Sequence, residues 1–229
     1  MSEAISPRLS GLEGVRFKYQ TLEMGGEDFH LRSLRDLQQC PQHIDDVESL
    51  GVSSATWPLF GVLWQAEELL SHLMVTENTS GKRVLELGCG LALASLVLKR
   101  RGMDVTATDL NPYADGFLSF NASLNEIEAV DFGQASWAAA QSPLGRFDLL
   151  LGSDLLYDHH NLVPLVSFID GHLQPDGEVL IVDPGRGLTN KFTRQMKGLG
   201  FHVDVRSMIY ETIDGSSKSY WIMRFARPQ

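Results

Sequence analysis

The sequence predicts an α/β fold with a doubly wound, mostly parallel sheet whose last strand is antiparallel. Three observations lead to this prediction. From residue 83 onward, short apolar runs alternate with stretches of helical periodicity. A Gly-Cys-Gly turn joins the first apolar run to the helix after it. Two final strand-like segments flank Asp214-Gly215, a pair typical of hairpins. Strands that alternate with helices form parallel sheets, whereas a terminal hairpin reverses the edge.

Size and composition indicate one substantial core with an extension. The chain has 229 residues, of which 43% are hydrophobic, and a formal net charge of −10. An acidic surface repels phosphate backbones, so nucleic acid is a poor partner. The two cysteines, Cys40 and Cys89, lie in a loop and a glycine turn, which argues against a disulfide. With no apolar run of membrane-spanning length, we expect a soluble, cytoplasmic monomer.

Residues 1–54 are predicted to form an N-terminal extension, and residues 55–229 the main domain. Within the extension, Val15–Leu34 alternates between apolar and polar residues around Gly25-Gly26. This pattern predicts a β-hairpin that stays outside the central sheet. Gln38–Ser54 is predicted to be a loop.

The first half of the main domain shows alternating periodicities. Apolar residues at helical spacing predict a helix over Phe60–Met74. Gly102 is expected to end a later helix, and Asn111 to cap the next one before Pro112. The remaining predicted elements here are strands over 83–87 and 104–108, helices over 92–101 and 112–125, and a weak strand over 130–133.

The second half continues the alternation and then reverses it. The apolar run Asp148–Gly152 is typical of a buried parallel strand. A turn is expected at Pro175-Asp176-Gly177. The other predicted elements are helices over 162–172 and 189–198 and strands over 178–182, 201–210 and 218–225.

The glycine turn indicates a nucleoside-containing ligand. Gly88 and Gly90 allow the backbone to approach a ligand where a side chain would obstruct it. Asp109 ends the next strand, where a carboxylate can accept hydrogen bonds from both ribose hydroxyls. At this point the ligand is either a dinucleotide or S-adenosylmethionine. The terminal antiparallel hairpin favours the second, because dehydrogenase folds usually continue with parallel strands.

Over roughly residues 55–225 the chain resembles the seven-β-strand S-adenosylmethionine-dependent methyltransferases, and within them family 16, the protein lysine methyltransferase-like group. The resemblance rests on Glu86-Leu87-Gly88-Cys89-Gly90 with Asp109 downstream, on the Asp-x-x-Tyr element Asp154–Tyr157, and on Trp57-Pro58. It implies a Rossmann-like, seven-stranded sheet. The chain departs from the commonest pattern at Ala92, where a third glycine is frequent.

The resemblance also implies roles for particular residues. Glu86 suits a ligand with a cationic amino group, and Trp137 corresponds to a tryptophan beside the adenine ring. Asp154 and Tyr157 are the expected catalytic residues, with Asp154 orienting the acceptor amine. No metal is expected. The residues expected to bind S-adenosylmethionine are Trp57, Glu86, Gly88, Cys89, Gly90, Asp109, Leu110, Asn111, Trp137 and Ser153.

The implied activity is direct, in-line methyl transfer to a lysine side chain of a protein. A small-molecule methyltransferase is the main alternative, because the cofactor half would be identical. An NAD-dependent oxidoreductase and a non-catalytic binding module are further alternatives. Arg186 follows the fifth strand of the alternating series and is predicted to lie at the surface.

Overall fold

The computed structural model of the protein describes residues 12, 14–41, 48–139, 142–211, 215 and 217–228. Its centre is a seven-stranded sheet in the order β5-β4-β3-β6-β7-β9-β8. Strands β3 to β7 run parallel, and β9 pairs antiparallel with both β7 and β8. This arrangement confirms the predicted fold class. The strands are β3 (Arg83–Leu87), β4 (Asp104–Asp109), β5 (Asp131–Gln134), β6 (Phe147–Ser153), β7 (Leu173–Asp183), β8 (His202–Glu211) and β9 (Ser217–Ala226).

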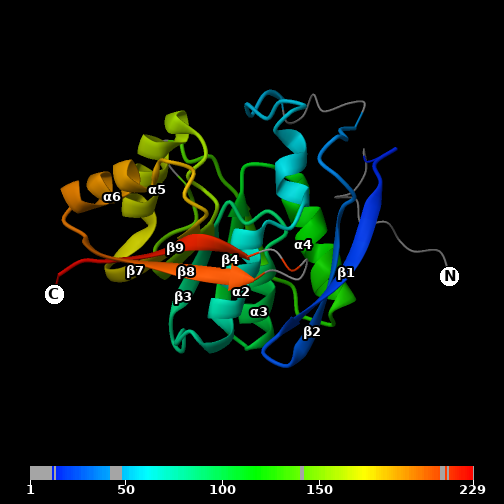
Figure 1. Ribbon diagram of the computed structural model, residues 1–229, viewed down its shortest axis with the longest axis horizontal. Helices are drawn as coiled ribbons and strands as arrows, with labels where there is room; N and C mark the ends of the chain where they lie inside the picture. The colour runs from blue at the N-terminus through cyan, green and yellow to red at the C-terminus, as the bar shows by residue number, and fades with distance from the viewer. Residues whose placement is uncertain are drawn as a thin grey trace.

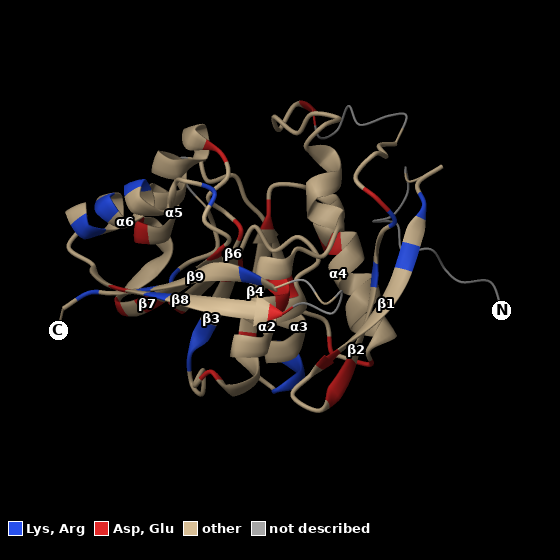
Figure 2. Ribbon diagram, in the orientation of Figure 1, with Lys and Arg blue, Asp and Glu red and all other residues tan. Residues whose placement is uncertain are grey.

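Helices cover both faces of this sheet (Figure 1). Buried side chains of α2, α3 and α4 join one apolar cluster, and those of α5 and α6 join the other. Lys and Arg residues gather on α6 (Figure 2), whose apolar Phe192 and Met196 are buried. The helices are α2 (Gln65–Thr76), α3 (Leu93–Arg100), α4 (Tyr113–Leu124), α5 (Leu162–His172) and α6 (Thr189–Gly198), with short 3₁₀ helices η2 (Trp57–Gly61) and η3 (His159–Asn161).

Two predicted boundaries are wrong. The helix expected from Phe60 begins only at Gln65, because the backbone at Val62 and Trp64 is extended. The turn expected at residues 175–177 lies within β7. There the pairing with β6 slips, so that Phe147 faces Leu173 while Leu149 faces Glu178. The turn residues therefore form a bulge in one long strand. Asp214 of the expected hairpin turn lies outside the described residues.

The N-terminal hairpin forms a two-stranded antiparallel sheet of its own, as predicted, from β1 (Phe17–Met24) and β2 (Glu27–Leu34). Gly25 and Gly26 both have positive φ, which suits a tight hairpin turn. Leu22, Phe29 and Leu31 are buried in the same apolar cluster as the helices α2 to α4. The hairpin thus shares a core with the main domain, and the division at residue 54 stays a prediction.

Two asparagines of the α4 region bind β2 as a neighbouring strand would. The Asn121 side chain accepts from the Arg32 N–H at 2.8 Å and donates to the Arg32 carbonyl at 3.2 Å. Asn125 makes the same pair of bonds to His30. Two alternate residues of β2, His30 and Arg32, are thereby held by side-chain amides. These bonds, with the shared apolar core, hold the hairpin in place.

Among the described residues, none of the helices has the length and apolar character needed to cross a membrane.

Replacing Asn121 with Ala should lower the free energy of unfolding by about 2–3 kcal/mol, because it leaves the buried polar groups of Arg32 without these partners. Urea denaturation measures this change. Ser123→Ala is the matched control, since Ser123 is exposed on the same helix and should change stability little. An equal loss in the two variants would contradict the role given to Asn121.

Candidate functional site

The turn between β3 and α3 requires its two glycines. Gly88 and Gly90 have φ of +55° and +54°, in the left-handed region that other residues rarely adopt. A Cβ on Gly88 would lie 2.9 Å from Leu155 Cδ2, and one on Gly90 would lie 3.1 Å from the Phe60 carbonyl oxygen. Neighbouring protein atoms therefore leave no room for a Cβ at either position, and the turn at the carboxyl end of β3 requires glycine.

Asp109, at the end of β4, holds this turn from the side. Its Oδ2 accepts from the Gly90 N–H at 3.0 Å, and its Oδ1 accepts from the Asn111 N–H at 2.8 Å. Burial raises the pKa of Asp109, whereas these backbone hydrogen bonds lower it. Each carboxylate oxygen retains a lone pair for a further donor, such as a ribose hydroxyl.

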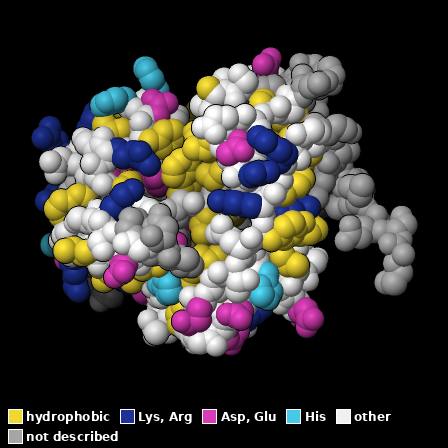
Figure 3. Space-filling model, turned by 45° about the vertical axis from the view of Figure 1, so that its right-hand side comes forward, with side chains coloured by type: hydrophobic (Ala, Val, Ile, Leu, Met, Phe, Trp, Pro, Cys, Tyr) yellow, Lys and Arg dark blue, Asp and Glu magenta, His cyan; other side chains and the backbone are white. Residues whose placement is uncertain are grey.

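A cavity of about 580 Å³ opens beside the turn. Parallel sheets bind ligands at the carboxyl ends of their strands, and β3, β4 and β6 all end here. The space-filling view shows the surface hollowed between two lobes, with hydrophobic side chains inside (Figure 3). The predicted site residues that line the cavity are Gly88, Cys89, Gly90, Asp109, Leu110, Asn111, Trp137, Ser153, Asp154 and Tyr157.

Two predicted cofactor residues lie elsewhere. Trp57 is fully buried, and its ring packs edge-on against Phe60 and Tyr113. Glu86 is buried beneath the turn rather than in the cavity lining. The tryptophan that lines the cavity before α2 is Trp64, whose indole N–H donates to the Leu59 carbonyl at 2.9 Å.

Glu67 is a site residue that sequence reasoning missed. It lies on α2, lines the cavity and is buried. Its Oε1 accepts from the Ala94 N–H at 2.9 Å, and its Oε2 accepts from the Ser153 hydroxyl at 2.8 Å. The signal was its spacing, because Glu67 lies four residues after Leu63 and three before Leu70, on the apolar face of the predicted helix.

Glu86 and Glu67 form a buried acid pair. Glu86 Oε2 accepts from the Ser95 backbone N–H at 2.9 Å and from the Ser95 hydroxyl. The two glutamate side chains are also hydrogen-bonded to each other, which requires one proton between them. Burial raises the pKa of both acids; for Glu86 the charge of Glu67 adds to the effect of burial and raises the pKa well above its ordinary value. The proton therefore resides on Glu86, and Glu67 carries the negative charge.

Asp154 is held in an ion pair at the cavity mouth. Arg186 binds it through two hydrogen bonds, Nε to Oδ1 and Nη2 to Oδ2, both at 2.7 Å. Asp154 has a φ of +50°, and its N–H donates to the Val182 carbonyl. The sequence predicted Arg186 at the surface. Its side chain is 45% exposed, but the residue also lines the cavity.

Cys89 and Tyr157, two further titratable residues of the cavity lining, have raised rather than lowered pKa values. Burial raises the pKa of Cys89 well above its ordinary value, with Asp109 adding to the effect, so its thiol stays protonated. Burial also raises the pKa of Tyr157, as do Asp109, Asp158 and Asp154. In the described part of the chain, no cluster of three or more His, Cys, Asp or Glu residues could hold a metal ion.

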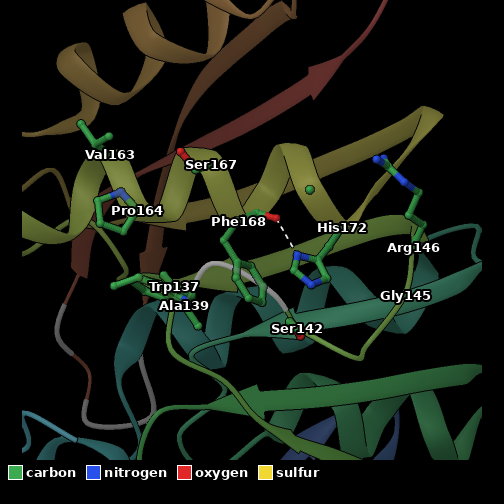
Figure 4. A pocket seen from close by; sticks show the side chains of 12 residues that line it. Trp137, Ala139, Ser142, Gly145, Arg146, Val163, Pro164, Ser167, Phe168 and His172 are labelled. Carbon is green, nitrogen blue, oxygen red and sulfur yellow. Dashed lines mark hydrogen bonds between the residues drawn. The ribbon is translucent and has the colours of Figure 1, made fainter.

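A second cavity, of about 770 Å³, lies between α5 and the segment after β5 (Figure 4). Trp137 lines both cavities. In the second, His172 Nδ1 donates a hydrogen bond to the Phe168 carbonyl at 2.8 Å, and the His172 ring stacks on the Phe168 ring. Neither the glycine turn nor a carboxylate lines it. The first cavity is therefore the candidate site.

Comparison with known proteins identifies sequence relatives. A family model described as lysine methyltransferase matches residues 45–197, more than half of the chain. Protein N-lysine methyltransferase METTL21A of Danio rerio is 31% identical over 143 residues, which cover 60% of this chain and 62% of that protein. Electron transfer flavoprotein beta subunit lysine methyltransferase of Xenopus laevis is 29% identical over 133 residues, covering 56% and 53%. The chain thus spans less than two thirds of the length of either relative.

Solved structures confirm the fold. The ribosomal protein L11 methylase of Lactobacillus delbrueckii subsp. bulgaricus superposes with a TM-score of 0.58 at 21% identity, covering 73% of this chain and 81% of that chain. An O-methyltransferase family protein from Burkholderia thailandensis gives a TM-score of 0.59 at 14% identity, covering 79% and 62%.

Glu86→Gln should remove part of the pH dependence of stability. Because the pKa of folded Glu86 exceeds 4.5, its ordinary value, the folded chain keeps a proton that the unfolded chain releases. This stabilisation is complete below the ordinary pKa and is lost as the pH rises toward the raised one. The glutamine cannot titrate.

The free energy of unfolding of the wild type, minus that of the variant, should therefore fall as the pH rises from 4.5, the ordinary pKa, toward the raised pKa, by at most about 1.4 kcal/mol per pH unit. Urea denaturation of both proteins across this range measures the difference. A difference that is constant or rises with pH would show that Glu86 is charged in the folded protein.

Proposed function

This chain belongs to the lysine methyltransferase family, and we propose on that premise that it transfers a methyl group from S-adenosylmethionine to a lysine side chain of a protein. The curated relatives named above are lysine methyltransferases. The structural observation that supports the proposal most is the cavity itself. One space at the carboxyl ends of β3, β4 and β6 is lined by the glycine turn, Asp109 and Asp154.

The residues of the cavity fit an adenosyl ligand. At Gly88 and Gly90 the glycine turn presents backbone without a side chain to the cavity. Asp109 offers carboxylate lone pairs for a ribose diol, and Trp137 offers an aromatic face for an adenine ring. The volume of about 580 Å³ lies within the range typical of small-molecule sites.

S-adenosylmethionine, when bound, supplies a methyl group on a positively charged sulfur that a neutral amine can attack in line. The protein must therefore deliver the acceptor amine without its proton. For a lysine with an ordinary pKa, deprotonation at pH 7 costs roughly 4.6 kcal/mol. An apolar rim that excludes water lowers this cost, because burial disfavours the ammonium form.

The ion pair between Asp154 and Arg186 at the cavity mouth also favours the neutral form of the acceptor amine. A free Asp154 carboxylate would stabilise an ammonium ion beside it and oppose deprotonation. Arg186 compensates that charge through its two hydrogen bonds. Asp154 can then accept a hydrogen bond from the amine and orient it, while the guanidinium disfavours a second cation. The proton leaves to water.

The rim of the cavity supports a protein acceptor over a metabolite. Tyr157 is 53% exposed and Arg186 is close to half exposed, so this side of the mouth is open to a macromolecule. We further propose that the protein acts as a cytoplasmic monomer that does not bind nucleic acid. The net charge of −10 and the two free cysteines support that setting.

Titration with S-adenosylhomocysteine and with NAD separates methyl transfer from hydride transfer. We expect the first ligand to bind and the second not to, because Glu67 and Glu86 carry one buried negative charge beside the turn. Isothermal titration calorimetry measures both affinities. Binding of NAD alone would overturn the proposed function, and the failure of Asp109→Ala to weaken S-adenosylhomocysteine would overturn the role of Asp109.

Asp154→Ala should abolish methyl transfer and leave the affinity for S-adenosylhomocysteine almost unchanged, since Asp154 orients the acceptor and not the cofactor. Transfer of labelled methyl groups into protein and calorimetry measure the two properties separately. Asp158→Ala is the matched control, because Asp158 also lines the cavity but binds the backbone of η3. Equal losses of activity and cofactor affinity in Asp154→Ala would refute this division of roles.

A further inference from the structure

Glu67 places a buried negative charge in the lining of the cavity. Of the two acids in the buried pair, it is the one that lines the cavity, whereas Glu86 lies beneath the turn. Each Glu67 carboxylate oxygen accepts one hydrogen bond from the protein, from Ala94 or from Ser153. A carboxylate has about four acceptor positions, and the proton shared with Glu86 takes a third, so Glu67 can accept one more donor from the cavity.

The charge of the pair resides on Glu67. Glu86 already accepts two hydrogen bonds from Ser95 through one oxygen, and its other oxygen receives no N–H or O–H from the described residues. That oxygen suits a proton shared with Glu67, as the raised pKa of Glu86 requires. A neutral Glu86 and an anionic Glu67 present a single negative charge to the cavity.

Asp109 and Glu67 are the two carboxylates that line the cavity beside the glycine turn, and they lie on opposite sides of β3. Asp109 is on β4, and Glu67 is bound to Ser153 at the end of β6, while β3 lies between these strands. A ligand whose ribose reaches Asp109 therefore extends across the end of β3 toward Glu67. In S-adenosylmethionine the group at that far end is the amino acid moiety, which carries an ammonium.

We propose that Glu67 is a cofactor-binding residue that accepts a hydrogen bond from the ammonium group of the methionyl moiety, and that Glu86 is a neutral positioning residue beneath it. This inference rests on the proposed function. It reverses the role that the sequence motif suggested, in which Glu86 itself met the cation.

The proposal predicts different effects for three glutamine variants. Glu67→Gln keeps an oxygen for the Ala94 N–H but loses the charge, so the affinity for S-adenosylhomocysteine should fall about 10- to 100-fold. Glu86→Gln resembles the protonated acid and should change the affinity at most about threefold. Glu68→Gln is the matched control, because Glu68 is buried on the same helix and binds the Tyr210 hydroxyl instead.

A second ligand distinguishes binding from a structural role. Methylthioadenosine has the adenosyl thioether but lacks the amino acid moiety, so Glu67→Gln should leave its affinity unchanged. Calorimetry with both ligands on the four proteins is the experiment. An equal loss for both ligands in Glu67→Gln, an equal loss in Glu86→Gln or Glu68→Gln, or no loss at all would overturn the inference. If the wild type bound neither ligand, the proposed function would fail first, and the inference with it.

Discussion

Three carboxyl groups hold the backbone on which the site is built. Asp109, Glu67 and Glu86 accept from the N–H groups of Gly90, Ala94 and Ser95 respectively. Ala94 and Ser95 lie in the first turn of α3, whose N–H groups have no partner within the helix. Ala92, which precedes the helix, has no side-chain acceptor and adopts a left-handed conformation. Glu67 and Glu86 therefore cap the helix from neighbouring positions, and Asp109 holds the glycine turn.

Local patterns in the sequence indicated several of the residues that line the cavity. Gly88, Gly90 and Asp109 lie where the glycine turn and the strand after it place them, because a turn between a strand and a helix is a local structure. Asp154 and Tyr157 also line the cavity, as their position after β6 indicated. The sheet order and the antiparallel edge followed from the alternation of elements and the terminal hairpin.

The features of the fold and of the site that could not be predicted from the sequence depend on contacts between segments far apart in the chain. Arg186 reaches Asp154 from a loop 32 positions away in the sequence, and Glu67 reaches Ser153 across 86. Asn121 binds a strand 89 residues earlier. A single sequence contains no signal for such pairs, since side-chain direction depends on the packing of whole elements. The choice between Trp57 and Trp64 could not be predicted for the same reason. Both tryptophans precede α2, but the extended backbone at Trp64 places only the Trp64 ring at the cavity.

We propose that this cavity brings an adenosyl cofactor to a neutral lysine of a protein. The most direct measurement incubates the protein with methyl-labelled S-adenosylmethionine and a protein extract, and then hydrolyses the labelled protein to amino acids. We expect label in methyl-lysine, and we expect it to disappear with Asp154→Ala. Label that enters only small molecules, or that enters protein at residues other than lysine, would contradict it.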